Sequence, residues 1–199
     1  MAREQDGEAV TAQLSTRDRL ILLGVARDSI RRSIDGHRLE DPALDAYAAT
    51  LTPIRACFVT LETAGALRGC IGTLKARRPL VTEVAHMARA AALEDPRFPR
   101  VTQPELAGLR ISISVLSVAE PMQFGSEAEL VGMLRPGVDG LILRDGYRSG
   151  TFLPSVWDKL PQPVDFVRQL KRKAGLPPDH WSTALTVERY TTESFSEEP

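Results

Sequence analysis

A cysteine, Cys70, stands between two glycines in the stretch RGCIG at positions 68–72. A thiolate is a strong nucleophile, and nearby arginine or lysine side chains and free backbone amides stabilise it. Arg68 and a basic run that follows the stretch place positive charge close to Cys70 in the sequence. Gly69 and Gly72 carry no side chain, so a ligand or a peptide backbone could approach closely there. These residues predict either a reactive thiol or a packed structural cysteine, and the packed cysteine is the commoner case.

An acidic and a basic side chain, Asp95 and Arg97, follow the end of a predicted helix. A carboxylate and a guanidinium at a cleft can orient a polar substrate through charged hydrogen bonds. The same pair can instead hold a loop together as a structural salt bridge. Both interpretations stay open from the sequence.

No histidine accompanies the cysteines as a general base. His86 falls on the face of a predicted helix opposite its apolar residues, which is typical of a solvated side chain. His37 and His180 lie in predicted loops, and three scattered histidines with two cysteines give no metal-ligand spacing. We therefore expect no metal site. Because the chain also lacks the common nucleotide-binding and hydrolase motifs, we expect no cofactor.

The second cysteine, Cys57, precedes Cys70 in a predicted hairpin. With an even number of residues in the turn, the two thiols share one face of the hairpin, and with an odd number they do not. Two thiols on one face could form a redox couple, although such pairs are more often simply packed in a reducing compartment.

The composition is that of an ordinary globular protein, with 199 residues, of which 43 % are hydrophobic and 26 % charged. The net charge of -1 and the pI near 6.3 argue against a nucleic-acid or membrane-surface binder, since both depend on a large positive excess. No apolar run approaches the roughly 20 residues of a membrane span, and the polar first residues do not resemble a signal peptide. We expect a cytoplasmic protein with reduced thiols.

Hydrophobic periodicity and turn residues predict alternating helices and strands. Ser15 begins a helix, with Asp18 at the spacing of a capping box, and Gly36 ends it. A loop with one short helical turn follows over 37–53. A hairpin, a second helix and a clearly alternating strand come next. Their expected ranges are 55–62 and 67–74 for the hairpin strands, 80–93 for the helix, 104–106 for a helical turn and 109–119 for the last strand.

The second half repeats part of this order. Ser126 caps a brief helix that runs through Leu134, and Asp145-Gly146 is the strongest hairpin signal in the chain. The hairpin runs into Gly150-Thr151, which echoes Gly72-Thr73 after the first hairpin. Such an echo is compatible with an internal duplication. The expected ranges are 140–144 and 147–153 for the hairpin strands, 163–174 for a helix and 184–192 for a final strand.

Five segments carry a resemblance to one family, and Trp181 follows the last of them. They are LRGCIGT at 67–73, DPRF at 95–98, SISVLS at 112–117, GTFLPSVW at 150–157 and KAGL at 173–176. The sequence is identified as a member of the AMMECR family, named for the human Alport syndrome, midface hypoplasia and elliptocytosis chromosomal-region protein. Microbial members are called AmmeMemoRadiSam system protein A. The resemblance covers about residues 15–195.

The resemblance implies an α+β fold. In this fold two β3-α2 repeats form one mainly antiparallel, barrel-like sheet flanked by helices. A single domain would cover 15–195, with two internally similar halves at about 15–120 and 121–195. Residues 1–14 are small and polar, and we expect them to form a flexible N-terminus.

The resemblance also implies association with a Memo-like protein and a radical SAM enzyme, without implying a particular reaction. In an enzymatic hypothesis Cys70 is a thiolate nucleophile and Arg68 stabilises it or an anionic group. Asp95 and Arg97 position the substrate, and Thr151 completes the expected cleft. In the alternative, the same surface is a non-catalytic binding module that docks a partner protein or an anionic small molecule. The missing histidine favours this alternative.

Overall fold

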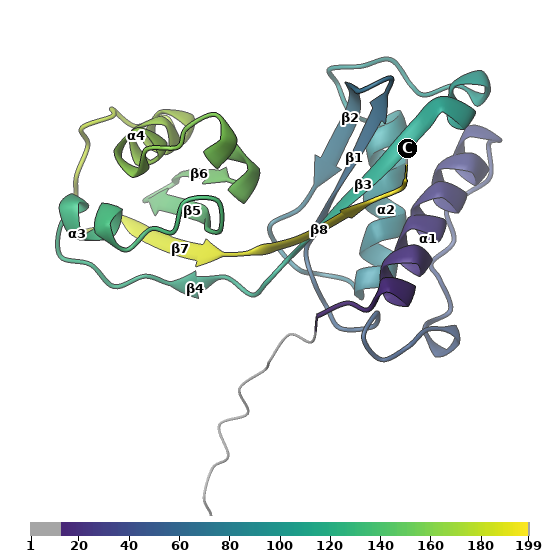
Figure 1. Cartoon of the computed structure of the whole chain (residues 1–199), viewed down its shortest axis with the longest axis horizontal. Helices are drawn as coiled ribbons and strands as arrows, with labels where there is room; N and C mark the ends of the chain where they lie inside the picture. The colour runs from purple at the N-terminus through teal and green to yellow at the C-terminus, as the bar shows by residue number, and fades with distance from the viewer. Residues whose placement is uncertain (1–12, 199) are drawn as a thin grey trace, which may run out of the picture. The chain divides into compact units, whose positions relative to one another are not determined.

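The computed structural model describes residues 13–198, so residues 1–12 of the expected flexible N-terminus lie outside the described part of the chain. The chain divides into two compact units (Figure 1). Unit 1 runs to Ile113 and takes in the C-terminal segment from Phe195, and unit 2 spans Ser114–Ser194. The boundary thus falls a few residues before position 120, where the two halves are expected to meet.

Unit 1 consists of two long helices and most of one four-stranded sheet. Its elements are α1 (Thr16–Ile34), η1 (Leu44–Ala46), β1 (Cys57–Thr63), β2 (Ala66–Gly72), α2 (Leu80–Leu93), η2 (Gln103–Gly108) and β3 (Leu109–Leu116), joined by β8 (Thr192–Ser196). The sheet order is β2-β1-β3-β8. Helix α2 packs against β1 and β2, and α1 packs against α2 (Figure 1).

Local signals explain the helices of unit 1. The Asp18 amide donates to Ser15 Oγ at 3.1 Å and the Ser15 amide donates to Asp18 Oδ2 at 3.1 Å, which confirms the predicted capping box. Leu14, just before this cap, is buried, so the end of the segment expected to be flexible is part of the core. Helix α2 has the predicted bounds and buries one wide apolar face.

The β1–β2 hairpin turns at Ala64 and Gly65, which have positive φ angles of 50° and 78°. A two-residue turn of this kind matches the twist of the flanking strands. The pairing then shifts by one residue between Leu61 and Glu62, as in a β-bulge. Residues of β2 beyond the bulge therefore face the side opposite to the one that an unbroken ladder would give.

Unit 2 repeats the hairpin–helix–strand order around its own core. Its elements are β4 (Glu120–Pro121), α3 (Glu127–Gly132), β5 (Gly140–Asp145), β6 (Arg148–Phe152), η3 (Pro154–Asp158), α4 (Pro163–Lys173) and β7 (Thr186–Tyr190). The sheet order is β4-β7-β5-β6. The Trp157 ring stacks on Phe166 with centroids 3.9 Å apart, in a core that also holds Leu130, Leu141 and Leu170.

The two sheets exchange their last strands. The strand β3 is followed by β4, which pairs with β7, and β7 is followed by β8, which joins β3. The order of the other strands is the same in both sheets. The second hairpin strand lies at one edge, the first hairpin strand comes next, and the strand that follows the helix comes third.

Two expectations about the sheets need correction. The resemblance implies a single barrel-like sheet, but the described strands form two four-stranded antiparallel sheets and close no barrel. The final strand expected at 184–192 is in fact β7 and β8, which are separated at Thr191, and β4 is not predicted at all. Both omissions have a local cause, because β4 has two residues and β8 has the polar sequence TESFS. Neither carries a hydrophobic period.

Candidate functional site

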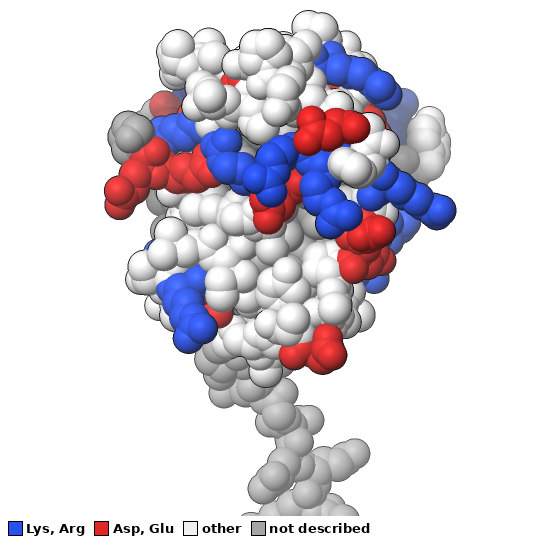
Figure 2. All heavy atoms as spheres, turned by 90° about the vertical axis from the view of Figure 1, so that its right-hand side faces the viewer, with Lys and Arg blue, Asp and Glu red and all other residues white. Residues whose placement is uncertain are grey.

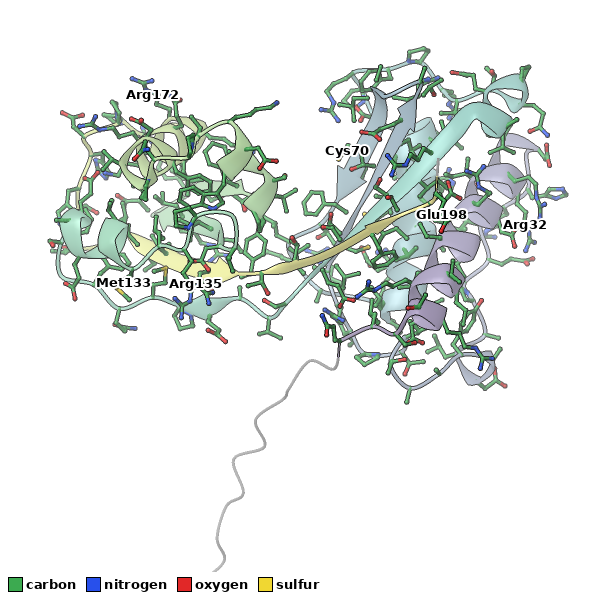
Figure 3. All side chains as sticks on the ribbon, in the orientation of Figure 1. Arg32, Cys70, Met133, Arg135, Arg172 and Glu198 are labelled. Carbon is green, nitrogen blue, oxygen red and sulfur yellow. The ribbon has the colours of Figure 1, made fainter. Side chains whose placement is uncertain are left out.

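Cys70 lies on the edge strand β2, directly opposite Thr60 of β1 (Figure 3). Its side chain is partly exposed, and the Thr60 hydroxyl donates to the Cys70 sulfur at 3.3 Å. Because of the bulge, Cys70 points away from the face that carries Cys57, Val59 and Leu61, all of which are fully buried. Burial raises the pKa of the Cys57 thiol well above its usual range. The two cysteines are therefore on opposite faces of the hairpin and do not form a redox pair.

Asp95 and Arg97 occupy the open edge of β2. Asp95 Oδ2 accepts the Cys70 amide at 2.8 Å, and Arg97 Nη2 donates to the Cys70 carbonyl at 3.1 Å. The same guanidinium holds the Asp95 carboxylate at 2.7 and 2.9 Å. An edge strand presents unpaired amides and carbonyls, and this pair satisfies one of each as a neighbouring strand would.

We call the Asp95–Arg97 pair on the main chain of Cys70 the clamp, and the environment of Asp95 fits this role. Its side chain is 2 % exposed. The Arg97 guanidinium, together with the backbone amides of Cys70 and Arg97, holds the pKa of Asp95 well below its usual range despite the burial. The carboxylate is thus a charged acceptor that fixes β2.

Arg68 is anchored to the loop that follows Asp95. Its Nε donates to Glu105 Oε1 at 2.7 Å and its Nη1 to the Pro99 carbonyl at 2.8 Å. Glu105 also accepts hydrogen bonds from the amide and hydroxyl of Thr102. The hydrogen bond from Arg68, followed by the two from Thr102, lowers the pKa of Glu105 to about 2. The guanidinium of Arg68 is therefore engaged with Glu105 and the loop carbonyls.

The two glycines of the RGCIG stretch are needed for internal packing. A Cβ on Gly69 would lie 2.2 Å from the Ala91 carbonyl oxygen of α2. A Cβ on Gly72 would lie 2.3 Å from the Phe58 ring. The space that each missing side chain leaves is thus already filled by protein, and neither glycine opens the strand to a ligand.

Thr151 lies in unit 2. Its hydroxyl donates to the Leu141 carbonyl at 2.8 Å and lies 3.2 Å from the Tyr190 hydroxyl. Gly150, the residue before it, lies against the Leu170 carbonyl of α4 and against Ala174, the residue that follows this helix. Gly69 contacts the last turn of α2 in the same way, so the counterpart of Gly150 is Gly69 and not Gly72.

No histidine is paired with a cysteine among residues 13–198. His86 Nε2 lies 2.7 Å from Asp41, and His180 is hydrogen-bonded to Asp145. Within the same residues, no three His, Cys, Asp or Glu side chains group so as to hold a metal ion. No helix of this described part is long and apolar enough to cross a membrane. Figure 2 shows Lys and Arg intermixed with Asp and Glu on the face it presents.

Three participants were not predicted from the sequence. Thr60 contacts the thiol, Phe58 covers Gly72, and Glu105 anchors Arg68. Only Glu105 carries a recognisable signal, since it lies three residues after Thr102 in a capping box. Thr60 and Phe58 depend on the strand register, which the bulge sets.

The fold defines a class of α+β proteins built from two similar hairpin–helix units with exchanged strands. A family model described as AMMECR1 matches residues 23–195, and the chain belongs to this family. A protein from Methanothermobacter thermautotrophicus is 36 % identical over 94 % of this chain and 98 % of its own length. One from Thermococcus gammatolerans is 39 % identical over 89 % of each chain. The crystal structure of uncharacterized protein PH0010 from Pyrococcus horikoshii is similar with a TM-score of 0.79 at 34 % identity, over 89 % of this chain and 90 % of that one.

Proposed function

We propose that this chain is a non-catalytic binding component of a cytoplasmic modification system that contains a Memo-like protein and a radical SAM enzyme. The expected partners follow from the family resemblance. The choice of a binding role over a catalytic one rests on how the side chains around Cys70 are used.

One observation carries the proposal. Three charged groups could activate a thiol or orient a substrate, and all three are already engaged. Asp95 and Arg97 bind each other and the main chain of Cys70, and Arg68 binds Glu105 and the Pro99 carbonyl. These bonds fix the edge strand β2, so that Cys70 lies beside Thr60 of β1 on the outer face of the sheet. A rigid surface lowers the entropy cost of docking a partner.

The docking surface we propose is the face of the β1–β2–β3 sheet opposite α2. It carries Thr60 and Cys70 with the alternating polar residues Arg110 and Ser112 of β3. Arg110 Nη1 lies 3.8 Å from Glu62 on the same face, so charges of both signs are available to a complementary partner.

Co-purification tests this function. A tagged chain is expressed with the Memo-like and radical SAM proteins of its own source, and retention of each is quantified. Cys70→Ser, which keeps the shape of the site, should retain the partner to the same extent as the unaltered chain. Thr60→Glu should reduce retention at least about fivefold, because a buried uncompensated charge in an interface costs more than 1 kcal/mol.

A matched control is Thr183→Glu, at an exposed position of unit 2. It should leave retention unchanged, and thermal unfolding should show that each variant is folded. If neither protein is retained by the unaltered chain, or if Thr60→Glu retains them fully, the proposed surface is wrong.

A second candidate, a cysteine-dependent enzyme, is favoured by a different observation. The thiol of Cys70 is partly exposed, and the Arg97 guanidinium donates to the carbonyl of the same residue. Arginine side chains near an accessible sulfur stabilise a thiolate. The rate of Cys70 alkylation relative to a free thiol separates this candidate from the binding module.

A further inference from the structure

A cavity of about 300 Å³ lies in unit 1, away from the RGCIG hairpin. One wall is formed by α1, the floor includes Ala85 of α2, and the segment 38–43 with Tyr47 forms the other side. The floor is fixed, because the buried Ser29 hydroxyl of α1 donates to the Ala85 carbonyl at 2.7 Å. This volume is at the lower end of the range of small-molecule sites, roughly 300–1,000 Å³.

The acidic side chains around the cavity all have partners, whereas one of its basic side chains has none among the described residues. Each of its three carboxylates has a partner: Asp28 pairs with Arg31, Glu40 pairs with Arg32, and Asp41 lies 2.7 Å from His86 Nε2. Figure 3 labels Arg32 on α1.

Two donors on the same cavity have no such partner. Arg38 makes no ion pair or hydrogen bond through its side chain within the described residues, and neither does the hydroxyl of Tyr47. Both groups line the cavity, and Tyr47 is half-buried. Arg38 is thus the cation that is left for a ligand, and the phenol of Tyr47 is able to donate in the same cavity.

Apolar side chains complete the lining. Val25, Leu39 and Pro42 contribute to the walls together with Ala85. A site of this composition suits a molecule with a compact apolar body and one anionic group. A guanidinium matches the planar geometry of a carboxylate through two parallel hydrogen bonds.

The segment over the cavity is weakly tied. Residues 38–42 take part in no backbone–backbone hydrogen bond among the described residues. They are held through Arg32–Glu40 and His86–Asp41, whose carboxylates are 72 % and 67 % exposed. Exposed ion pairs contribute little to stability, so this segment can open to admit a ligand at small cost.

We propose that this cavity binds a small organic carboxylate, with Arg38 and Tyr47 on its carboxyl group and the apolar body against Val25 and Ala85. This site is independent of Cys70 and of the docking function proposed above. Nothing in the RGCIG hairpin is needed for it.

Titration of the isotopically labelled full chain with benzoate, followed by NMR, tests the site. Benzoate should cause saturable shifts of the Val25 and Ala85 amides, and benzamide, its neutral analogue, should not. Arg38→Gln should weaken benzoate binding about tenfold, since hydrogen bonds to charged groups are the stronger ones. Tyr47→Phe should weaken it less.

Arg168→Gln is the matched control, because Arg168 is an exposed arginine of unit 2. It should leave the affinity for benzoate unchanged. Absent or non-saturating shifts, or equal affinity for benzoate in Arg38→Gln and the unaltered chain, would overturn the proposal. Tighter binding of phenyl phosphate than of benzoate would overturn the assignment to carboxylates.

Discussion

Asp95 has the features of a catalytic carboxylate, but it forms a hydrogen bond with the main chain of β2. A buried carboxylate beside an arginine is a common feature of active sites. Here it accepts the amide of Cys70, and Arg97 donates to the carbonyl of the same residue. The pair therefore closes the edge of β2 at the position of the thiol.

Asp95→Ala should destabilise the protein by about 1–3 kcal/mol, because the Cys70 amide and the Arg97 guanidinium lose their acceptor. The measurement is the free energy of unfolding in urea. Asp158→Ala, at an exposed carboxylate, should change it by less than about 0.5 kcal/mol. Equal effects of the two substitutions would contradict the clamp.

A second prediction at the residue scale concerns the stability of a Gly69 variant. Gly69→Ala should cost about 1–3 kcal/mol of stability, since its Cβ would overlap the Ala91 carbonyl of α2 and force the strand and the helix apart. Gly108→Ala is the comparison, because a Cβ there meets nothing within 4 Å. Thermal unfolding of both variants decides the matter, and a Gly69→Ala protein as stable as Gly108→Ala would remove the packing argument.

At the scale of elements, the hairpin–helix pair occurs twice, and in each pair a glycine of the second strand lies against the end of the helix. Gly69 of β2 touches the last turn of α2, and Gly150 of β6 touches the last turn of α4. Cys70 and Thr151 follow these glycines, so the thiol of one unit corresponds to the hydroxyl of the other. In unit 2 that hydroxyl is bound to the Leu141 carbonyl and takes part in the packing of the strand.

The β5–β7 pair in unit 2 is stabilised by a buried phenol. Burial raises the pKa of Tyr190 to about 12, against 10.0 for the free side chain. The folded state therefore holds the proton more tightly, so this stability is complete below about pH 10 and is lost as the pH rises toward 12.

The difference in unfolding free energy between the unaltered chain and Tyr190→Phe should shift by roughly 2–3 kcal/mol between about pH 9 and pH 12. The unaltered chain should lose more stability, because only it carries the phenol. Urea unfolding of both proteins across this range provides the measurement. Parallel pH profiles would show that Tyr190 is not protected as described.

Much of this element structure could be predicted from the sequence, because its signals are local. The capping box at Ser15 and Asp18 and the Asp145-Gly146 turn locate a helix and a hairpin directly. The strand β8 could not be found this way, since it is polar and exists through its pairing with β3. The strand register could not be predicted either, because a single bulge determines on which face of the sheet the Cys70 side chain lies.

Only some residues around Cys70 could be selected from the sequence, and their arrangement could not be predicted. Asp95 and Arg97 both form hydrogen bonds with the main chain of Cys70. The sequence does not show whether their polar atoms go to the main chain or to a ligand, since that depends on which strand edge is left open. Arg68 illustrates the same limit, because Glu105, 37 residues away, takes its guanidinium.

At the scale of the whole molecule, the chain leaves the sheet of unit 1 after β3 and returns to it with β8. The segment after β7 completes the sheet of unit 1, and Glu197 beyond it accepts from Arg27 of α1 at 2.6 Å and from the Ile111 amide at 2.9 Å. The C-terminal segment is therefore an integral part of the sheet of unit 1 and is bound to α1.

A chain that ends at Thr191 should leave β3 as an edge strand. Amide hydrogen exchange of β3 should become at least about tenfold faster, because loss of a pairing strand lowers the opening free energy by more than 1.4 kcal/mol. The amides of β5 should stay as protected as before. A chain that lacks only Pro199 serves as the control. Unchanged protection of β3 in the shorter chain would contradict the exchange.

The central claim is that the groups around Cys70 hold a binding surface and do not activate a nucleophile. The most direct test is the rate constant for alkylation of Cys70 in the native protein, measured by mass spectrometry beside glutathione at the same pH. We predict that Cys70 reacts no faster than glutathione, that Arg97→Gln changes this rate by less than about threefold, and that the buried Cys57 stays unmodified. A Cys70 that reacts at least about a hundred times faster than glutathione, and that slows sharply in Arg97→Gln, would contradict the account and establish the enzymatic alternative.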